Sequence, residues 1–134
     1  VWIPLVDVDT GSGCLEVIPR QKQLLEHQAE GGTMIKPHLM PDDKPVDCVM
    51  SRGDLLFMSA YTPHRGHTNS SNYVRWSMDL RFQKTGTPTG RPFHPEFILQ
   101  SASDPASVQN DYDEWCSRWD AGLEAAKGIG LHRV

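Results

Sequence analysis

Residues 73–82 read YVRWSMDLRF, a stretch in which polar and apolar side chains alternate. Alternation with a period of two is typical of a β-strand that has one polar face and one apolar face. The polar face carries Arg75, Ser77, Asp79 and Arg81, and the apolar face carries Trp76, Met78, Leu80 and Phe82. We expect the apolar face to pack on the protein and the polar face to point into a barrel interior or a cleft.

Arg75 and Ser77 are the residues of this strand best suited to bind a ligand. An arginine guanidinium is a planar fork that fits a carboxylate, and Ser77 lies two residues on, on the same face. With a histidine at the strand mouth, this pair predicts a site for a keto acid that chelates a metal. The alternative is that Arg75 forms an ion pair with an aspartate that lines the barrel.

The segment before this strand is a candidate metal-binding loop. Residues 61–72 read YTPHRGHTNSSN, and His64 and His67 lie close together in it. Neutral imidazole is a common metal ligand, so the pair suggests a metal site. The alternative is a polar loop whose histidines hydrogen-bond to backbone groups.

The N-terminal part of the chain predicts further short strands at 1–8, 14–19, 46–50 and 54–59. The sequence DTGSG at 9–13 is a turn signal, so the first two strands are expected to form a hairpin. The charged segment 20–30 is expected to be helical and to end at the two glycines that follow it. Residues 33–47 contain three prolines and are expected to be mostly loop.

The C-terminal part is predicted to wrap over the β core and then form a helix. Residues 84–103 are rich in proline, glycine and threonine and are expected to be extended, and Asp104 with Pro105 predicts a helix start. Gly128 and Gly130 are expected to end the helix. Helical spacing places one stripe on it, expected to pack on the core: Tyr112, Trp115, Cys116, Trp119 and Leu123. We therefore divide the chain into a β core, 1–83, and a wrap with a helix, 84–134.

Composition excludes several classes of protein. The 134 residues are enough for one domain or part of one, and 11 glycines with 10 prolines favour a turn-rich β protein. The net charge of −4 opposes nucleic-acid binding. No apolar run approaches the ~20 residues of a membrane span, and the first residues lack a signal peptide's basic region. Three cysteines without a CxxC motif favour a reducing, cytoplasmic setting.

Several motifs in order resemble the phytanoyl-CoA dioxygenase family of Fe(II)/2-oxoglutarate oxygenases. They are WIPL at 2–5, GCLEVIP at 13–19 and GDLLF at 53–57, followed by His64, Asn69 and Arg75. In that family, a histidine, an asparagine five residues later and an arginine eleven residues later follow a Gly-Asp strand. The resemblance covers residues 1–83.

The resemblance implies a mainly β fold, a double-stranded β-helix of the jelly-roll or cupin-like type, here incomplete at its N-terminus and followed by a C-terminal helix. It implies a dioxygenase that uses Fe(II), 2-oxoglutarate and O₂, with ascorbate as a supporting reductant, to hydroxylate a small organic substrate. It assigns His64 as an iron ligand and Arg75 as the partner of the 2-oxoglutarate C5 carboxylate. Ser77 would assist Arg75, and Trp2 would line the co-substrate pocket unless it is only a core aromatic. Asn69 would shape the loop.

The chain departs from the family pattern in three ways. Gly66 stands where the family often has serine, and His67 has no family role. The family's first two iron ligands form a His-x-Asp motif upstream of the Trp-x-Pro strand, where this sequence begins. The single His-x-acid motif here, at 94–96, follows Arg75 and is in the wrong order. We therefore expect a C-terminal portion that holds iron poorly alone and needs the N-terminal remainder or a complementary chain.

Three alternatives remain at this stage. One is a non-catalytic β-barrel binding module derived from the family, which absence of the upstream motif would favour. Another is an iron halogenase, in which the upstream carboxylate is replaced by alanine or glycine. The last, a structural or interaction protein, would not explain His64, Arg75 and Ser77 together.

Overall fold

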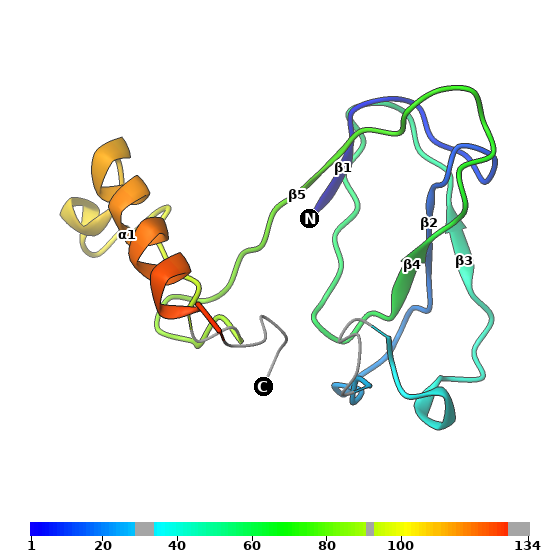
Figure 1. Cartoon of the computed structure of the whole chain (residues 1–134), viewed down its shortest axis with the longest axis horizontal. Helices are drawn as coiled ribbons and strands as arrows, with labels where there is room; N and C mark the ends of the chain where they lie inside the picture. Colours follow the sequence, from blue (N-terminus) through cyan, green and yellow to red (C-terminus); the bar gives the residue numbers. More distant parts are fainter. Residues whose placement is uncertain (29–33, 91–92, 129–134) are drawn as a thin grey trace. The chain divides into compact units, whose positions relative to one another are not determined.

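The structure, a computed structural model, describes residues 1–28, 34–90 and 93–128. The chain divides into two compact units, Val1–Phe82 and Gln83–Val134. The first unit holds short antiparallel strands and the second holds one long helix (Figure 1). A mainly β chain with a C-terminal helix is thereby confirmed, whereas the double-stranded β-helix stays a prediction.

A two-stranded sheet pairs the start of the chain with the strand that follows Arg75. Strand β1 (Trp2–Pro4) is antiparallel to β5 (Ser77–Asp79), with Trp2 opposite Asp79 and Pro4 opposite Ser77. On its other side, Trp2 exchanges two backbone hydrogen bonds of 2.9 Å with Leu56. Proline lacks an N–H, so Pro4 is tolerated at the end of this short ladder, where its carbonyl accepts from the Gly53 N–H at 3.1 Å.

A three-stranded antiparallel sheet has the order β3-β2-β4. Its strands are β2 (Leu15–Val17), β3 (Val46–Cys48) and β4 (His64–Gly66). Residues directly opposite in an antiparallel pair have side chains on the same face. The register therefore places Leu15 with Cys48 and Gly66, Glu16 with Asp47 and Arg65, and Val17 with Val46 and His64.

The core of the first unit decides which face of this sheet is the inner one. The buried cluster consists of Trp2, Val8, Cys14 and Leu15, and Cys48 packs against it. Because Leu15 and Cys48 share this cluster with Trp2 of β1, their side of the sheet faces the interior. We call this side the inner face; by register it also carries Val17, which is buried, and Val46 and His64, which are exposed at its edge strands. The outer face carries Glu16, Asp47 and Arg65.

The expected turn at 9–13 forms, but the expected hairpin does not. Ser12 N–H donates to Asp9 Oδ1 at 2.7 Å, and this bond holds the pKa of Asp9 below its usual value. Gly13 has φ +87°, and a Cβ there would lie 3.0 Å from the carbonyl oxygen of His67. The hairpin prediction is wrong because β1 pairs with β5, and β2 pairs with β3 and β4.

The helix expected over 20–30 is also absent from the described part of that segment. Residues 20–28 contain no helix, and Arg20 has φ +66°. The backbone instead pairs across a loop, with Gln28 N–H donating to Met34 O at 2.8 Å and Lys36 N–H to Glu26 O at 3.0 Å. Only a short 3₁₀ turn, η1 (Pro37–Leu39), follows, and the two glycines after residue 30 lie outside the described residues.

The expected strands are shorter than predicted, and one was missed. Within 73–82 only β5 is a strand, and within 54–59 only Leu56 forms a bridge pair. Strand β4 lies inside the segment 61–72, which was predicted to be a loop.

The apolar face of 73–82 was expected to pack on the protein, but Trp76 is 64% exposed and Phe82 61% exposed, so that prediction is wrong. Neither side chain belongs to the core cluster of the first unit.

The helix of the second unit begins later than predicted. Residues Pro105–Ser107 form only a short 3₁₀ turn, η2, and helix α1 spans Tyr112–Ala125. Asp111 caps it, since its Oδ1 accepts from the Glu114 N–H at 3.0 Å. The helix ends before Gly128, which has φ +78°, as expected of a glycine that follows a helix. Gly130 lies outside the described residues.

The aromatic stripe of α1 packs within the second unit, but only in part. Trp119 lies 5.4 Å from His94 and 6.5 Å from Phe97, measured between ring centroids, and Trp115 lies 6.3 Å from Phe97. Tyr112 and Leu123 are exposed, so their expected burial is wrong. The stripe is thus a partial packing face whose two ends are open to solvent.

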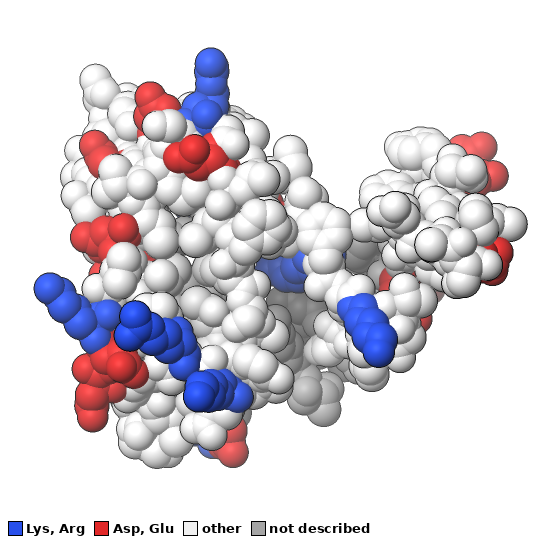
Figure 2. Space-filling model, turned by 180° about the vertical axis from the view of Figure 1, so that it is seen from behind, with Lys and Arg blue, Asp and Glu red and all other residues white. Residues whose placement is uncertain are grey.

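The surface of the molecule carries mixed charge. Figure 2 shows acidic and basic side chains lying next to one another on the face of the first unit that it draws. No helix of the described residues is long and apolar enough to cross a membrane.

Candidate functional site

The pairing of β1 with β5 brings Trp2, Arg75 and Ser77 together. Arg75 Nη1 donates a hydrogen bond to Ser77 Oγ at 3.0 Å, and the Arg75 Cζ lies 5.5 Å from the centroid of the Trp2 ring. Trp2 is directly opposite Asp79. Ser77 and Arg75 precede Asp79 by two and four residues, and side chains of a strand alternate with a period of two, so the side chains of Trp2, Ser77 and Arg75 lie on the same face. The stacking and the hydrogen bond both restrain the guanidinium.

The Arg75 guanidinium is a half-buried cation available to an anionic ligand. In the described part of the chain, its partners are the Ser77 hydroxyl and the Trp2 ring, and no carboxylate forms an ion pair with it. The alternative of an arginine paired with a barrel aspartate is therefore not observed. A fixed guanidinium without an acidic partner can bind an incoming carboxylate through two parallel hydrogen bonds.

His64 lies on β4, opposite Val17 and on the inner face of the three-stranded sheet. Its Nδ1 is 2.9 Å from the carbonyl oxygen of Thr62. A carbonyl can only accept, so Nδ1 donates to it, and Nε2 is the ring nitrogen left for a metal. This is the common arrangement of a metal-binding histidine, in which a hydrogen bond to the other nitrogen sets the tautomer.

His64 and Arg75 lie on different sheets. His64 belongs to the three-stranded sheet, whereas Arg75 lies two residues before β5 of the two-stranded sheet. Among the described residues, no hydrogen bond, ion pair or ring contact joins His64 to Trp2, Arg75 or Ser77. The structure thus assembles the three residues predicted to bind the co-substrate, while the role of His64 as a metal ligand stays a prediction.

The loop between His64 and Arg75 is held by Asn69. Its Nδ2 donates to Tyr73 O at 2.8 Å, and its Oδ1 accepts from Ser71 N at 2.9 Å and Ser71 Oγ at 2.6 Å. The backbone N–H of Ser70 donates to Gly11 O at 2.8 Å, which ties the loop to the turn before β2. Asn69 therefore positions the chain that leads from one sheet to the other.

We expect Asn69→Ala to lower the free energy of unfolding by about 1–2 kcal/mol, because it removes three local hydrogen bonds from a partly solvated loop. Urea unfolding followed by tryptophan fluorescence would measure the change. Asn72→Ala, an exposed asparagine in the same loop, is the matched control and should change the stability by less than about 0.5 kcal/mol. Equal effects of the two substitutions would show that Asn69 does not organise the loop.

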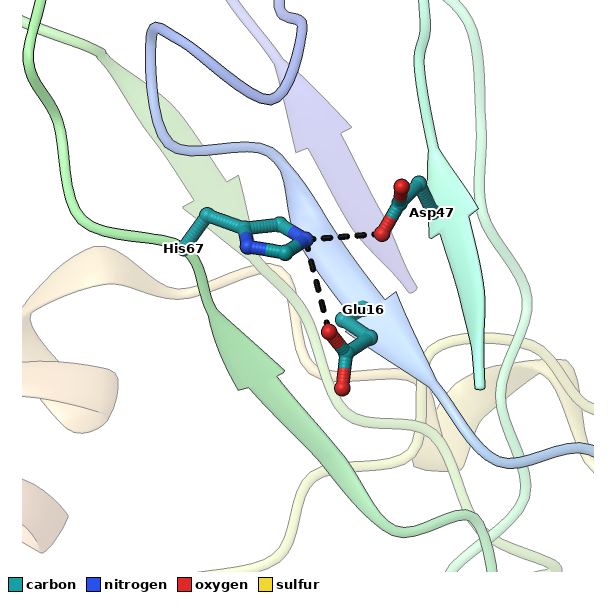
Figure 3. A group of neighbouring side chains, drawn as sticks. All are labelled: Glu16, Asp47 and His67. Carbon is teal, nitrogen blue, oxygen red and sulfur yellow. Dashed lines mark hydrogen bonds and ion pairs between the residues drawn. The ribbon is translucent and has the colours of Figure 1, made fainter. Parts of the chain in front are cut away.

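A second group of polar side chains was missed by the sequence analysis. Figure 3 shows Glu16 of β2, Asp47 of β3 and His67, just after β4, converging on one point. Each offers one ligand atom, and these atoms all lie within 4.8 Å of one another. His67 was noted without a role, and Glu16 and Asp47 were not singled out. No short spacing links the three in sequence; only the register of three strands does.

Cys14 and Cys48, which lie near Asp47, are not activated thiols. Burial raises the pKa of Cys14 and of Cys48 above the usual thiol value, and the charge of Asp47 raises both further. Both side chains are therefore protonated at neutral pH and are poor metal ligands or nucleophiles. The three cysteines, Cys14, Cys48 and Cys116, are free.

A comparison with protein families identifies the family to which these residues belong. The model of the family described as phytanoyl-CoA dioxygenase (PhyH) matches residues 1–77. The chain belongs to the phytanoyl-CoA dioxygenase family. Members of this family are oxygenases that use Fe(II) and 2-oxoglutarate, so the resemblance read from the motifs is confirmed.

The match to the phytanoyl-CoA dioxygenase family includes every residue that the sequence analysis proposed for the site. Trp2, His64, Arg75 and Ser77 all lie within it. No curated protein and no solved structure matches the chain.

Proposed function

We propose that this protein is an Fe(II)- and 2-oxoglutarate-dependent dioxygenase that hydroxylates a small organic substrate. The observation that carries the proposal is the environment of the Arg75 guanidinium. Its guanidinium is half-buried, stacked on Trp2 and bonded to Ser77, and it has no acidic partner among the described residues. A site of this kind fits the far carboxylate of a dicarboxylic keto acid.

The residues present fit 2-oxoglutarate. Arg75 would bind the C5 carboxylate, and the Ser77 hydroxyl, which accepts from Arg75, can donate its own proton to the same carboxylate. Trp2 is buried and forms an apolar wall beside the guanidinium. By limiting access of water there, the indole strengthens the electrostatic attraction between Arg75 and the ligand.

His64 fits one position of an iron site. Its Nε2 lone pair is available, and its ring is fixed by the Thr62 carbonyl. A facial triad also needs a second histidine and a carboxylate on the same side of the metal. Glu16, Asp47 and His67 cannot complete the triad at His64, because the register places Glu16 and Asp47 on the outer face of the sheet and His64 on the inner face.

We propose that the two remaining iron ligands come from polypeptide outside residues 1–134, either the N-terminal remainder of the same protein or a complementary chain. When bound, iron would supply oxygen activation coupled to decarboxylation of 2-oxoglutarate. The residues of this chain would orient the keto acid, neutralise its charge and exclude water.

The proposal predicts that His64→Ala reduces succinate formation from 2-oxoglutarate at least 100-fold, because loss of a metal ligand removes the metal-dependent step. The assay uses the intact protein with Fe(II), O₂ and 2-oxoglutarate. His38→Ala, an exposed histidine of η1, is the matched control and should retain activity.

The outcomes separate the proposal from its alternatives. Full activity of His64→Ala would contradict the assignment of His64. An intact protein that binds 2-oxoglutarate but forms no succinate would be a binding module. Succinate formation that requires chloride, with chlorinated product, would identify a halogenase.

A further inference from the structure

The outer face of the three-stranded sheet carries two carboxylates directly opposite each other. Glu16 of β2 and Asp47 of β3 are a cross-strand pair, and like charges in this arrangement destabilise a sheet. The Glu16 side chain is only 14% exposed, so water screens its charge poorly. A nearby cation would therefore stabilise this pair.

The cations that the chain itself provides balance this pair only in part. Arg65 lies 3.1 Å from Glu16, but its side chain is 74% exposed and no contact joins it to Asp47. His67 Nε2 lies 2.7 Å from Asp47 Oδ1 and 3.5 Å from Glu16 Oε2. Among the described residues, Arg65 is the one lysine or arginine that forms an ion pair with either carboxylate, and it reaches only Glu16.

The same three side chains form a ligand set for a divalent metal. We propose that Glu16, Asp47 and His67 bind a zinc-like divalent cation on the outer face, separate from any iron held at His64. One nitrogen and two carboxylate oxygens suit Zn²⁺, whereas Ca²⁺ and Mg²⁺ prefer oxygen alone. With three protein ligands, the remaining position would be taken by water.

The distance between the ligand atoms of His67 and Glu16 agrees with this assignment. Zinc bonds of ~2.0–2.2 Å place tetrahedral ligand atoms about 3.4 Å apart, close to the 3.5 Å between His67 Nε2 and Glu16 Oε2. The contact of His67 with Asp47 is shorter because the carboxylate accepts the Nε2 proton, which a metal would displace.

The backbone already holds the three ligands on a rigid frame. Glu16 and Asp47 lie within paired strands (Figure 3). The His67 N–H donates to Cys14 O at 2.9 Å, which continues the ladder between β2 and β4. A bound metal would therefore link three strands that are far apart in sequence. It would stabilise the sheet that carries His64, because a ligand that binds only the folded state adds to its stability.

Titration of the chelator-treated, metal-free intact protein with Zn²⁺, followed by calorimetry, tests the proposal. We expect zinc to bind His64→Ala as it binds the wild type. In Asp47→Asn and in His67→Gln the zinc affinity should fall at least tenfold, because even residues that only hydrogen-bond to a metal ligand lower the affinity by that factor when they are replaced. Asp42→Asn, an exposed carboxylate in the loop before β3, is the matched control for Asp47→Asn. Zinc should raise the melting temperature of the wild type and of Asp42→Asn, and not that of Asp47→Asn.

Two results would overturn the inference. If Asp47→Asn and Asp42→Asn bind zinc equally well, the group is only an ion-pair network around His67. If zinc binding disappears in His64→Ala and persists in Asp47→Asn, the metal belongs to the inner face. Co²⁺ in place of zinc gives an independent check, since its visible absorption should change in His67→Gln when the nitrogen ligand is lost.

Discussion

Replacing Arg75 with alanine is expected to weaken 2-oxoglutarate binding by about 10- to 100-fold. Hydrogen bonds between charged groups contribute roughly 1.5–3 kcal/mol, and each 1.4 kcal/mol is a factor of ten in the dissociation constant. The substitution removes the cation that we propose binds the C5 carboxylate, and it leaves Ser77 with no guanidinium to accept from. Calorimetry of the intact protein with Fe(II), under anaerobic conditions, would measure the loss.

Arg81→Ala provides the matched control for this experiment. Arg81 has the same charge and lies further along the same stretch, but its side chain is exposed. Its loss should leave the dissociation constant for 2-oxoglutarate within about twofold, because exposed charges act weakly at a distance in salt. Arg75→Lys keeps the charge and loses the fork, so intermediate binding would identify bidentate recognition. Unchanged affinity in Arg75→Ala would contradict the proposed site.

Trp2→Ala is expected to lower the free energy of unfolding by about 3–5 kcal/mol. Trp2 is 2% exposed and belongs to the core cluster that joins β1 to β2. Its removal would leave a cavity between the sheets and would free the Arg75 guanidinium from the ring that it stacks on. Urea unfolding followed by far-ultraviolet circular dichroism would measure the change without depending on tryptophan fluorescence.

Trp76→Ala tests whether burial, rather than residue type, causes that loss. Trp76 is 64% exposed, so its removal should change the stability by less than about 1 kcal/mol. If the two substitutions destabilise the protein equally, Trp2 is not the core residue described above. If Trp2→Ala unfolds the chain, Trp2→Phe retains enough of the core for 2-oxoglutarate binding to be measured.

The sequence was most informative where the signal is local. The turn at 9–13 could be predicted because Asp9 and Ser12 bond to each other's backbone over three residues. Alternation placed Arg75 and Ser77 on one face, since the period of a strand is set by its own backbone. The order of the motifs identified the family, and the match to residues 1–77 confirmed it.

Helix and strand limits were less predictable because several signals compete. Asp104 with Pro105 and the later Asp111 both offer a helix N-cap, and only Asp111 caps α1. The segment that contains β4 is polar and has turn-forming residues, so nothing local marks it as a strand. Backbone hydrogen bonds to β2 make His64–Gly66 a strand.

What the sequence determined by itself is therefore the family, the turn at 9–13 and the shared face of Arg75 and Ser77, all of which depend on neighbouring residues. Only the tertiary structure decided that Trp2 stacks on Arg75, that His64 lies on the inner face, and that Glu16, Asp47 and His67 meet on the outer face. These depend on the register between strands far apart in the chain. A shift of one residue in that register would move each side chain to the opposite face.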